Sequence, residues 1–371
     1  MVQSPLEAEY DGMPQSAIAT GLVDLVLPVQ AIPGAVLRFA GTQPQLPVGD
    51  DETQVDDEAR ELLHKIFAQM RARTGRDFTR YKRSTILRRI ARRMQLHQVE
   101  ELEAYLDLLR ARPEEVQALA DELLIIVTNF FRDGAVFESL ESDVLPRIFA
   151  RKSAQDSEVR AWVVGCATGE EAYSLAILLL EEVSRHHAPP RIQVFATDLH
   201  EQSLERARQG FYPGDIEADV SPERLRRFFL EENGGYRVRK EVREVVVFAP
   251  HNLLGDPPFS RLDLITCRNV LIYLQREAQE EVDELFQYAL RPDGFLLLGG
   301  SEAISRPELF VADGKNTSVY RKRDVPTPEP RLPVFPFSRG RGRRSRTGSC
   351  ISGSSSGSRR RACSSPSTTG W

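Results

Sequence analysis

Cysteine is scarce in this chain, and long apolar runs and an N-terminal targeting pattern are absent. Two of its four cysteines, Cys166 and Cys267, lie in strand-end motifs and the others are Cys350 and Cys363, which indicates reduced thiols rather than a disulfide framework. No apolar stretch approaches the roughly 18 residues of a membrane helix. No basic segment followed by an apolar core opens the chain. We therefore expect a cytoplasmic protein without a membrane span.

Acidic residues are missing from the last part of the chain. From Arg331 to Trp371 there are nine arginines and no aspartate or glutamate. The whole chain has a formal net charge of −5, so the rest of it carries −14. The tail is rich in serine, glycine and arginine, which predicts disorder. The acidic body argues against general binding of nucleic acid, and 41% apolar residues are enough for a globular core.

Composition and periodicity divide the chain into five parts. A short N-terminal piece, too small to fold alone, precedes a linker rich in Gly, Pro, Gln and Asp. A helical domain follows, because apolar residues recur at helical spacing with few breakers. An α/β domain and the Arg/Ser-rich tail complete the chain. These parts span residues 1–40, 41–56, 57–140, 141–323 and 324–371.

Short apolar runs alternate with helix patterns from Glu158 onward, which predicts a mostly parallel sheet with helices on both faces. The predicted strands are Val159–Val164, Ile192–Thr197, Leu262–Cys267 and Phe295–Leu298, and the predicted helices are 170–185 and 201–209. An insertion at about 211–248, which includes Glu244–Phe248, has the pattern of a small antiparallel unit.

A glycine-containing turn joins the first of these strands to the next helix. Gly165 and Gly169 permit a tight turn and close approach of a ligand, and the amides that open the helix face into the turn. Glu170 and Glu171 occupy the helix start, where a dinucleotide would place its pyrophosphate. Carboxylates repel phosphate and favour a cation. The turn therefore favours S-adenosylmethionine, which carries ammonium and sulfonium groups, over NAD or ATP, and no metal is expected.

Polar residues end two further predicted strands. Asp198 follows the second strand, where an acid can hold ribose hydroxyls, although a lone aspartate there is also a common helix cap. Arg268, Asn269 and Tyr273 follow the Leu262–Cys267 strand. Ligands bind outside the carboxyl ends of strands in open parallel sheets, so these side chains should converge on the cofactor. Asn269 can cap a helix in the same position.

The segment Val127–Asp133 lies between the helical block and the sheet. Its adjacent aromatics are ordinary core residues when taken alone. Pockets form at domain seams, however, so Thr128 and Arg132 are candidate site residues.

Six motifs occur in the order found in CheR-type chemotaxis receptor methyltransferases, and the chain resembles this family over about residues 60–322. They are Thr128-Asn-Phe-Phe-Arg132, Gly165-Cys-Ala-Thr-Gly-Glu-Glu-Ala-Tyr-Ser174, Ala196-Thr-Asp198, Asn252-Leu-Leu254, Cys267-Arg-Asn-Val-Leu-Ile-Tyr273 and Gly299-Gly-Ser-Glu302. The resemblance implies a helical domain, a Rossmann-like S-adenosylmethionine methyltransferase sheet and a small inserted antiparallel β subdomain. It also implies methyl transfer to glutamate side chains in the cytoplasmic helical region of chemotaxis-type receptors, by a monomer.

The resemblance implies roles for individual residues. Arg132 and Tyr273 would flank the transferred methyl group. Gly165 belongs to the cofactor turn, and the other positions that match cofactor contacts of the family are Thr128, Arg132, Glu171, Asp198, Asn252, Leu253, Arg268 and Asn269. One position departs from the family, because Ile126 stands where the family has a cofactor-contacting Asn.

A predicted helix at Arg80–Leu96 carries a basic face formed by Arg88, Arg89, Arg92 and Arg93. A solvated face and a nucleic-acid surface are open interpretations. Docking of an acidic receptor helix is the one that the family implies. Residues 1–40 resemble the last segment of a CheB-type methylesterase, but no histidine precedes His64, so this piece lacks a Ser-His-Asp site.

Two rival functions remain. Asp256-Pro-Pro-Phe259 imitates a motif of nucleic-acid base methyltransferases, but it precedes the Leu262–Cys267 strand instead of ending it. A non-catalytic module that binds the cofactor or a receptor is the other alternative. Ile126 leaves room for it, whereas the presence of Arg132, Glu171 and Tyr273 argues for an enzyme.

Overall fold

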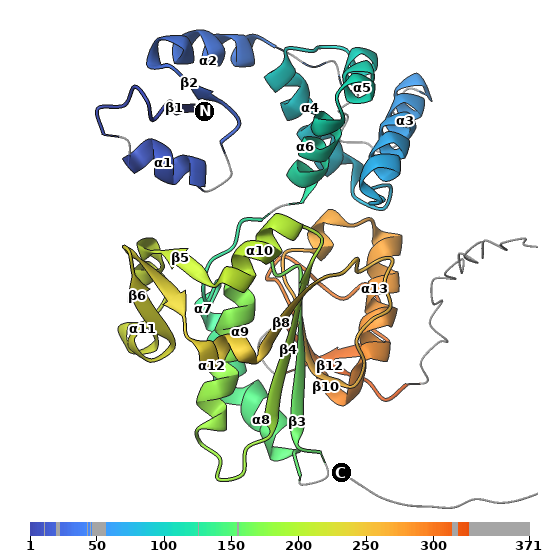
Figure 1. Ribbon diagram of the computed structural model, residues 1–371. Helices are drawn as coiled ribbons and strands as arrows, with labels where there is room; N and C mark the ends of the chain where they lie inside the picture. The colour runs from blue at the N-terminus through green and yellow to red at the C-terminus, as the bar shows by residue number, and fades with distance from the viewer. Residues whose placement is uncertain are drawn as a thin grey trace, which may run out of the picture. The chain divides into compact units, whose positions relative to one another are not determined.

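The computed structural model describes residues 1–10, 12–19, 23–42, 44, 46, 57–124, 126–153, 156–313 and 318–325 (Figure 1). Nearly all of the predicted Arg/Ser-rich tail and most of the predicted linker lie outside these residues. Within them, no helix is long and apolar enough to cross a membrane. Cys166 and Cys267 are buried and free, which confirms the prediction of reduced thiols for these two.

The N-terminal piece contains a two-stranded parallel sheet and two helices. Its elements are β1 (Val2–Gln3), α1 (Gly12–Ala19), β2 (Val26–Leu27), the 3₁₀ turn η1 (Val29–Ala31) and α2 (Ile32–Gly41). Large apolar side chains such as Leu6, Tyr10 and Leu37 are exposed here. The strands are only two residues long, so the piece has little core of its own.

Four helices form the helical domain. They are α3 (Asp57–Thr74), α4 (Arg83–His97), α5 (Leu102–Ala111) and α6 (Pro113–Leu123). Their apolar faces meet in one core that includes Ile66, Ile90 and Leu119. Helix α4 begins three residues later than predicted, because residues 79–80 form a turn and Tyr81 forms a β-bridge with Leu274.

The main sheet has seven strands in the order β11-β12-β10-β9-β3-β4-β8. If these seven strands are renumbered 1 to 7 in chain order and read from β8 to β11, the order is 3-2-1-4-5-7-6. The chain therefore reverses direction across the sheet between β3 and β9, as in doubly wound sheets. The pairs from β8 to β10 are parallel, whereas β12 is antiparallel to β10 and to β11. The strands are β3 (Glu158–Val164), β4 (Arg191–Asp198), β8 (Val246–Pro250), β9 (Leu262–Cys267), β10 (Leu290–Leu298), β11 (Phe310–Ala312) and β12 (Val319–Lys322).

Helices cover both faces of this sheet, as predicted, and Figure 1 shows α9 and α13 on opposite sides of the strands. One core joins Val163 of β3 to α8 and α9, and the other joins Trp162 to α13. The helices are α7 (Gly134–Ser139), the π-helical turn η2 (Leu140–Val144), α8 (Leu145–Ala150), α9 (Glu170–Val183), α10 (Glu201–Gln209), α12 (Lys240–Glu244), the 3₁₀ turn η4 (Leu271–Tyr273) and α13 (Arg276–Ala289). Val136 and Phe137 belong to the sheet's core, so the change of core comes before the predicted domain boundary at residue 140.

A small antiparallel sheet follows α10, and it confirms the predicted β subdomain. Its strands β5 (Phe211–Pro213), β6 (Phe229–Glu232) and β7 (Gly235–Val238) lie in the order β5-β7-β6, with η3 (Gly214–Ala218) and α11 (Pro222–Phe228) between β5 and β6. The assignment of Glu244–Phe248 to this unit was wrong. Val246–Pro250 is β8, which pairs in parallel with β4 in the main sheet. Periodicity does not distinguish a parallel from an antiparallel strand in so short an apolar run.

Candidate active site

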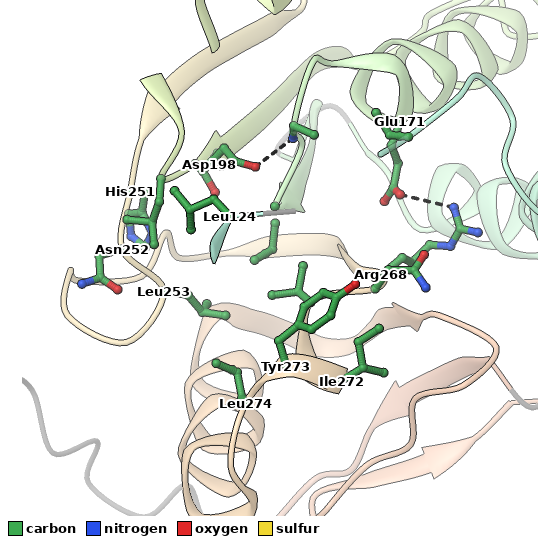
Figure 2. A pocket seen from close by; sticks show the side chains of 18 of the residues that line it. Leu124, Glu171, Asp198, His251, Asn252, Leu253, Arg268, Ile272, Tyr273 and Leu274 are labelled. Carbon is green, nitrogen blue, oxygen red and sulfur yellow. Dashed lines mark hydrogen bonds and ion pairs between the residues drawn. The ribbon is translucent and has the colours of Figure 1, made fainter. Parts of the chain in front are cut away.

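One cavity of about 240 Å³ lies at the carboxyl ends of β3, β4 and β9, where the chain reverses direction across the sheet (Figure 2). It brings together all of the predicted cofactor and catalytic residues. They are Thr128, Arg132, Gly165, Glu171, Asp198, Asn252, Leu253, Arg268, Asn269 and Tyr273. Strand ends are adjacent in a parallel sheet, which explains why motifs far apart in the sequence meet here.

The turn after β3 forms one wall, and its glycines are required by geometry. Gly165 and Gly169 have φ angles of 67° and 98°, which residues with a side chain rarely adopt. A Cβ atom on Gly165 would also lie 2.5 Å from Cγ2 of Val270, and one on Gly169 would lie 2.8 Å from Cβ of Ala207. The turn can therefore lie directly against the β9 loop and α10 only because both positions lack side chains.

Asp198 ties this turn to the end of β4. Its Oδ2 accepts a hydrogen bond from the amide of Ala167 at 2.8 Å, and its Oδ1 accepts one from the amide of His200 at 2.8 Å. Burial raises the pKa of the Asp198 carboxyl above its ordinary value, although these amides oppose the shift. Asp198 therefore braces two backbone turns as well as lining the cavity. The cap of α10 is His200, whose side chain accepts a hydrogen bond from the amide of Ser203, so the interpretation of Asp198 as a helix cap was wrong.

Glu171 and Arg268 form a buried ion pair at the other side of the cavity. Arg268 Nη1 donates to Glu171 Oε2 at 3.2 Å, and the Thr266 hydroxyl donates to Oε1 at 2.7 Å. Burial raises the pKa of Glu171, and the positive charge of Arg268 opposes that shift. The guanidinium of Arg268 is fully buried, and its Nη2 also donates to the carbonyl of Arg132 at 2.7 Å and to the carboxylate of Asp133. Arg268 thus connects β9 and α9 to the loop between the two domains.

Arg132 and Tyr273 approach the cavity from separate loops. Arg132 Nη1 donates to the carbonyl of Val127 at 3.1 Å, so the guanidinium folds back over its own loop. Figure 2 shows the Tyr273 ring with Glu171 and Asp198 on one side and Ile272 and Leu274 on the other. The carbonyl of Tyr273 accepts a hydrogen bond from the amide of Lys82 at 2.8 Å. The helical domain therefore contacts the loop that carries Tyr273.

Several cavity residues were not predicted from the sequence. Tyr81 comes from the helical domain, and burial with the nearby charge of Asp198 raises its pKa to about 12. His251 follows β8, stacks on Phe259 and forms a 3.0 Å hydrogen bond between its Nε2 and the carbonyl of Pro257. No local signal marked Tyr81. His251 could have been found from its place before Asn252, had β8 been assigned to the main sheet.

The four arginines of the predicted basic face of α4 have different environments: some are exposed to solvent, and others form ion pairs within the protein. Arg88 is exposed, and Arg89 is partly exposed. Arg92 donates to Glu122 at 2.9 Å and to Asp24 at 2.8 Å. Arg93 is mostly buried and pairs with Glu115, whose carboxylate also accepts a hydrogen bond from Tyr105. None of the four lines the cavity, and Arg93 is committed to the core of the helical domain.

Two family models match the chain in the order of its two domains. The model for the "CheR methyltransferase, all-alpha domain" matches residues 61–124, and the one for the "CheR methyltransferase, SAM binding domain" matches residues 126–317. The chain belongs to the CheR methyltransferase family. The break between the matches coincides with the change of core between α6 and α7. This chain is therefore an S-adenosylmethionine-dependent methyltransferase.

Relatives of known name agree with this assignment. The chemotaxis protein methyltransferase of Escherichia coli (strain K12) is 34% identical, with 64% of this chain and 82% of that protein covered. The protein of the same name from Salmonella typhimurium is 34% identical over 63% of this chain and 80% of its own. An uncharacterized 104.1 kDa protein of Rhodobacter capsulatus is 41% identical over 82% of this chain and 34% of its own. The chain thus spans about a third of the length of that larger relative.

Proposed function

We propose that this CheR-family enzyme transfers the methyl group of S-adenosylmethionine to glutamate side chains in the helical region of chemotaxis-type receptors. The observation that carries the proposal is one cavity in which two carboxylates, two guanidinium groups and two tyrosines converge at the reversal point of the sheet. The names of the enterobacterial relatives support a chemotaxis substrate.

The charged groups of the cavity fit the cofactor. Glu171 would hold the methionine ammonium group and Asp198 the ribose hydroxyls, while Arg132 would hold a carboxylate. The Nε atom of Arg268 is buried, and the structure gives it no hydrogen-bond partner among the described residues. This leaves one unused donor on a side chain that lines the cavity. When bound, the cofactor supplies an electrophilic methyl group on a sulfonium.

The chemistry needs positioning more than proton transfer. A glutamate side chain has a pKa near 4.3, so it is already an ionised nucleophile at neutral pH and needs no general base. The protein has to hold the carboxylate in line with the methyl group and to exclude water. We assign orientation of a carboxylate to Arg132, through paired N–H donors, and control of the approach angle to Tyr273.

Receptor docking is assigned to the outer part of α4. The family implies a basic face for an acidic helical partner, and Arg88 is the one of the four arginines that is exposed. Arg89 and Arg92 would flank it, whereas Arg93 would act by holding the helix against Glu115. We propose that the enzyme acts as a monomer.

Incubation with methyl-labelled S-adenosylmethionine and receptor-containing membranes, followed by mild base, tests the proposed function. A glutamyl methyl ester releases labelled methanol under base, whereas a methylated amine keeps its label. Base-labile label on the receptor is the expected result. Cofactor binding without transfer would instead support a non-catalytic module, and base-stable label would exclude glutamate as the acceptor.

A further inference from the structure

Glu302 is a buried carboxylate outside the described cavity, and it accepts four backbone hydrogen bonds. Its Oε1 accepts from the amides of Val270 at 2.9 Å and Ile272 at 3.2 Å. Its Oε2 accepts from the amides of Asn269 at 2.8 Å and Gly299 at 2.8 Å. The residue is 8% exposed. A carboxylate with every strong acceptor position directed at backbone amides organises the backbone that surrounds it.

Three of these four amides belong to the loop that carries the β9 side of the cavity. Asn269 adopts a φ angle of 59°, in the left-handed region that asparagine enters more readily than most residues with a side chain. Asn269, Val270, Ile272 and Tyr273 all line the cavity. The loop thus holds its conformation while three of its amides donate to one buried carboxylate.

The same loop supports the cofactor turn. The side chain of Val270 occupies the space next to Gly165, 2.5 Å from where a Cβ atom of that glycine would lie. A shift of Val270 would therefore move the contact surface of the turn after β3. Glu302 is not among the residues that line the cavity, but through this loop it supports both the β9 side of the cavity and the turn after β3.

We propose that Glu302 is a positioning residue for methyl transfer, which sets Asn269 and Tyr273 in place and keeps Val270 against Gly165. The proposal rests on the assignment of this cavity as the cofactor site. If Glu302 positions the loop, its two acceptor oxygens should matter more for cofactor binding than its negative charge, because each oxygen accepts hydrogen bonds from two amides. In Glu302→Gln, the new amide NH₂ group faces two N–H donors whichever way the side chain is flipped.

Two variants perturb the network in different ways. Glu302→Gln removes one acceptor and keeps the size of the side chain. Gly299→Ala keeps the carboxylate but places a Cβ atom 2.6 Å from its Oε2, which must then move. Gly300→Ala is the matched control, because a Cβ atom there meets nothing within 4 Å. Glu308→Gln, at an exposed carboxylate on the same segment, controls for the loss of charge.

The readouts are the Kd and stoichiometry of S-adenosylhomocysteine binding by calorimetry, kcat, the KM for receptor, and amide hydrogen exchange over residues 269–273. Loss of hydrogen bonds to a charged group predicts that Glu302→Gln and Gly299→Ala raise the Kd about 10- to 100-fold and lower kcat. Exchange over residues 269–273 should accelerate, while the KM for receptor stays within about twofold. Both control variants should resemble the wild type.

The pattern of these readouts separates positioning from general stability. An irreversibly misfolded fraction lowers the binding stoichiometry and kcat but leaves the Kd unchanged. Reversible unfolding raises the apparent Kd only when the free energy of unfolding approaches zero, which urea unfolding of each variant measures. Wild-type Kd values in Glu302→Gln and Gly299→Ala would therefore overturn the proposal. If Glu302→Gln is not recovered in a folded form, Gly299→Ala decides alone, and behaviour equal to Gly300→Ala refutes the positioning role. Failure of the wild type to bind the cofactor would instead refute the cofactor site.

Discussion

Replacing Gly165 by alanine tests whether the close contact between the cofactor turn and the β9 loop holds the site together. Two costs follow from the structure. The φ angle of 67° costs an L-residue about 1–2 kcal/mol. The added Cβ atom would lie 2.5 Å from Cγ2 of Val270, far inside an ordinary carbon contact of about 3.5–4 Å, and overpacking of this kind costs about 1–3 kcal/mol. We expect Gly165→Ala to lower the free energy of unfolding by about 2–5 kcal/mol.

The chain provides a control that isolates the steric part. Gly75 has a φ angle of 71°, and a Cβ atom there meets nothing within 4 Å. Gly75→Ala should therefore carry only the backbone cost of about 1–2 kcal/mol. Adding Val270→Ala to Gly165→Ala should relieve the overlap. That double variant should fall short of the additive loss of its two single variants, as expected for residues in contact.

Urea unfolding of the four variants gives the stabilities, and titration with S-adenosylhomocysteine gives the Kd values. Because a misplacement of about 1 Å can cost about 100-fold in a well-ordered site, the Kd of Gly165→Ala should rise by one to two orders of magnitude. A loss of stability no larger than that of Gly75→Ala would refute the packing argument. Strict additivity of Gly165→Ala and Val270→Ala would refute the contact itself.

Three further outcomes follow from the structure. Arg132→Ala should lower turnover by at least about 100-fold. The unfolding temperature should change little, because the side chain is half-buried and its hydrogen bond is to its own loop. A transfer rate equal to that of the wild type would contradict the role of Arg132. Burial raises the pKa of Glu170 from 4.5 to about 7 in the folded protein, so the folded state favours the neutral carboxyl group. The stability that this preference contributes is fully present below pH 4.5 and is lost as the pH rises through 7. In thermal melts, Glu170→Gln should therefore be more stable than the wild type by up to about 3 kcal/mol at pH 8.5, and little changed near pH 4.5. An equal gain in stability at both pH values would exclude the raised pKa of Glu170 as the cause. Arg88→Glu should raise the KM for receptor about tenfold, with kcat unchanged and with a weaker salt dependence, whereas Arg110→Glu, at an exposed residue of α5, should not. Equal effects of both variants would assign the change to net charge.

The sequence alone determined which chemistry this chain carries. Gly165, Asp198 and Arg268 each stand at a strand end that local hydrophobic periodicity locates, and parallel strands place their carboxyl ends at one edge of the sheet. For this reason the predicted cofactor residues are found around one cavity although they are spread over residues 128–273. The acidic start of α9 indicated a cationic cofactor for the same local reason.

Only the tertiary structure decided which partners these residues have. Tyr81 joins the cavity because its segment pairs with Leu274, nearly two hundred residues later, and no local pattern specifies such a pairing. Val246–Pro250 could pair in either direction until β4 became its neighbour. Arg93 had the helical spacing of a surface residue, but the carboxylate of Glu115 makes it part of a core. A charge or a strand acquires its role from groups that the fold brings near it, and spacing along the chain does not contain that information.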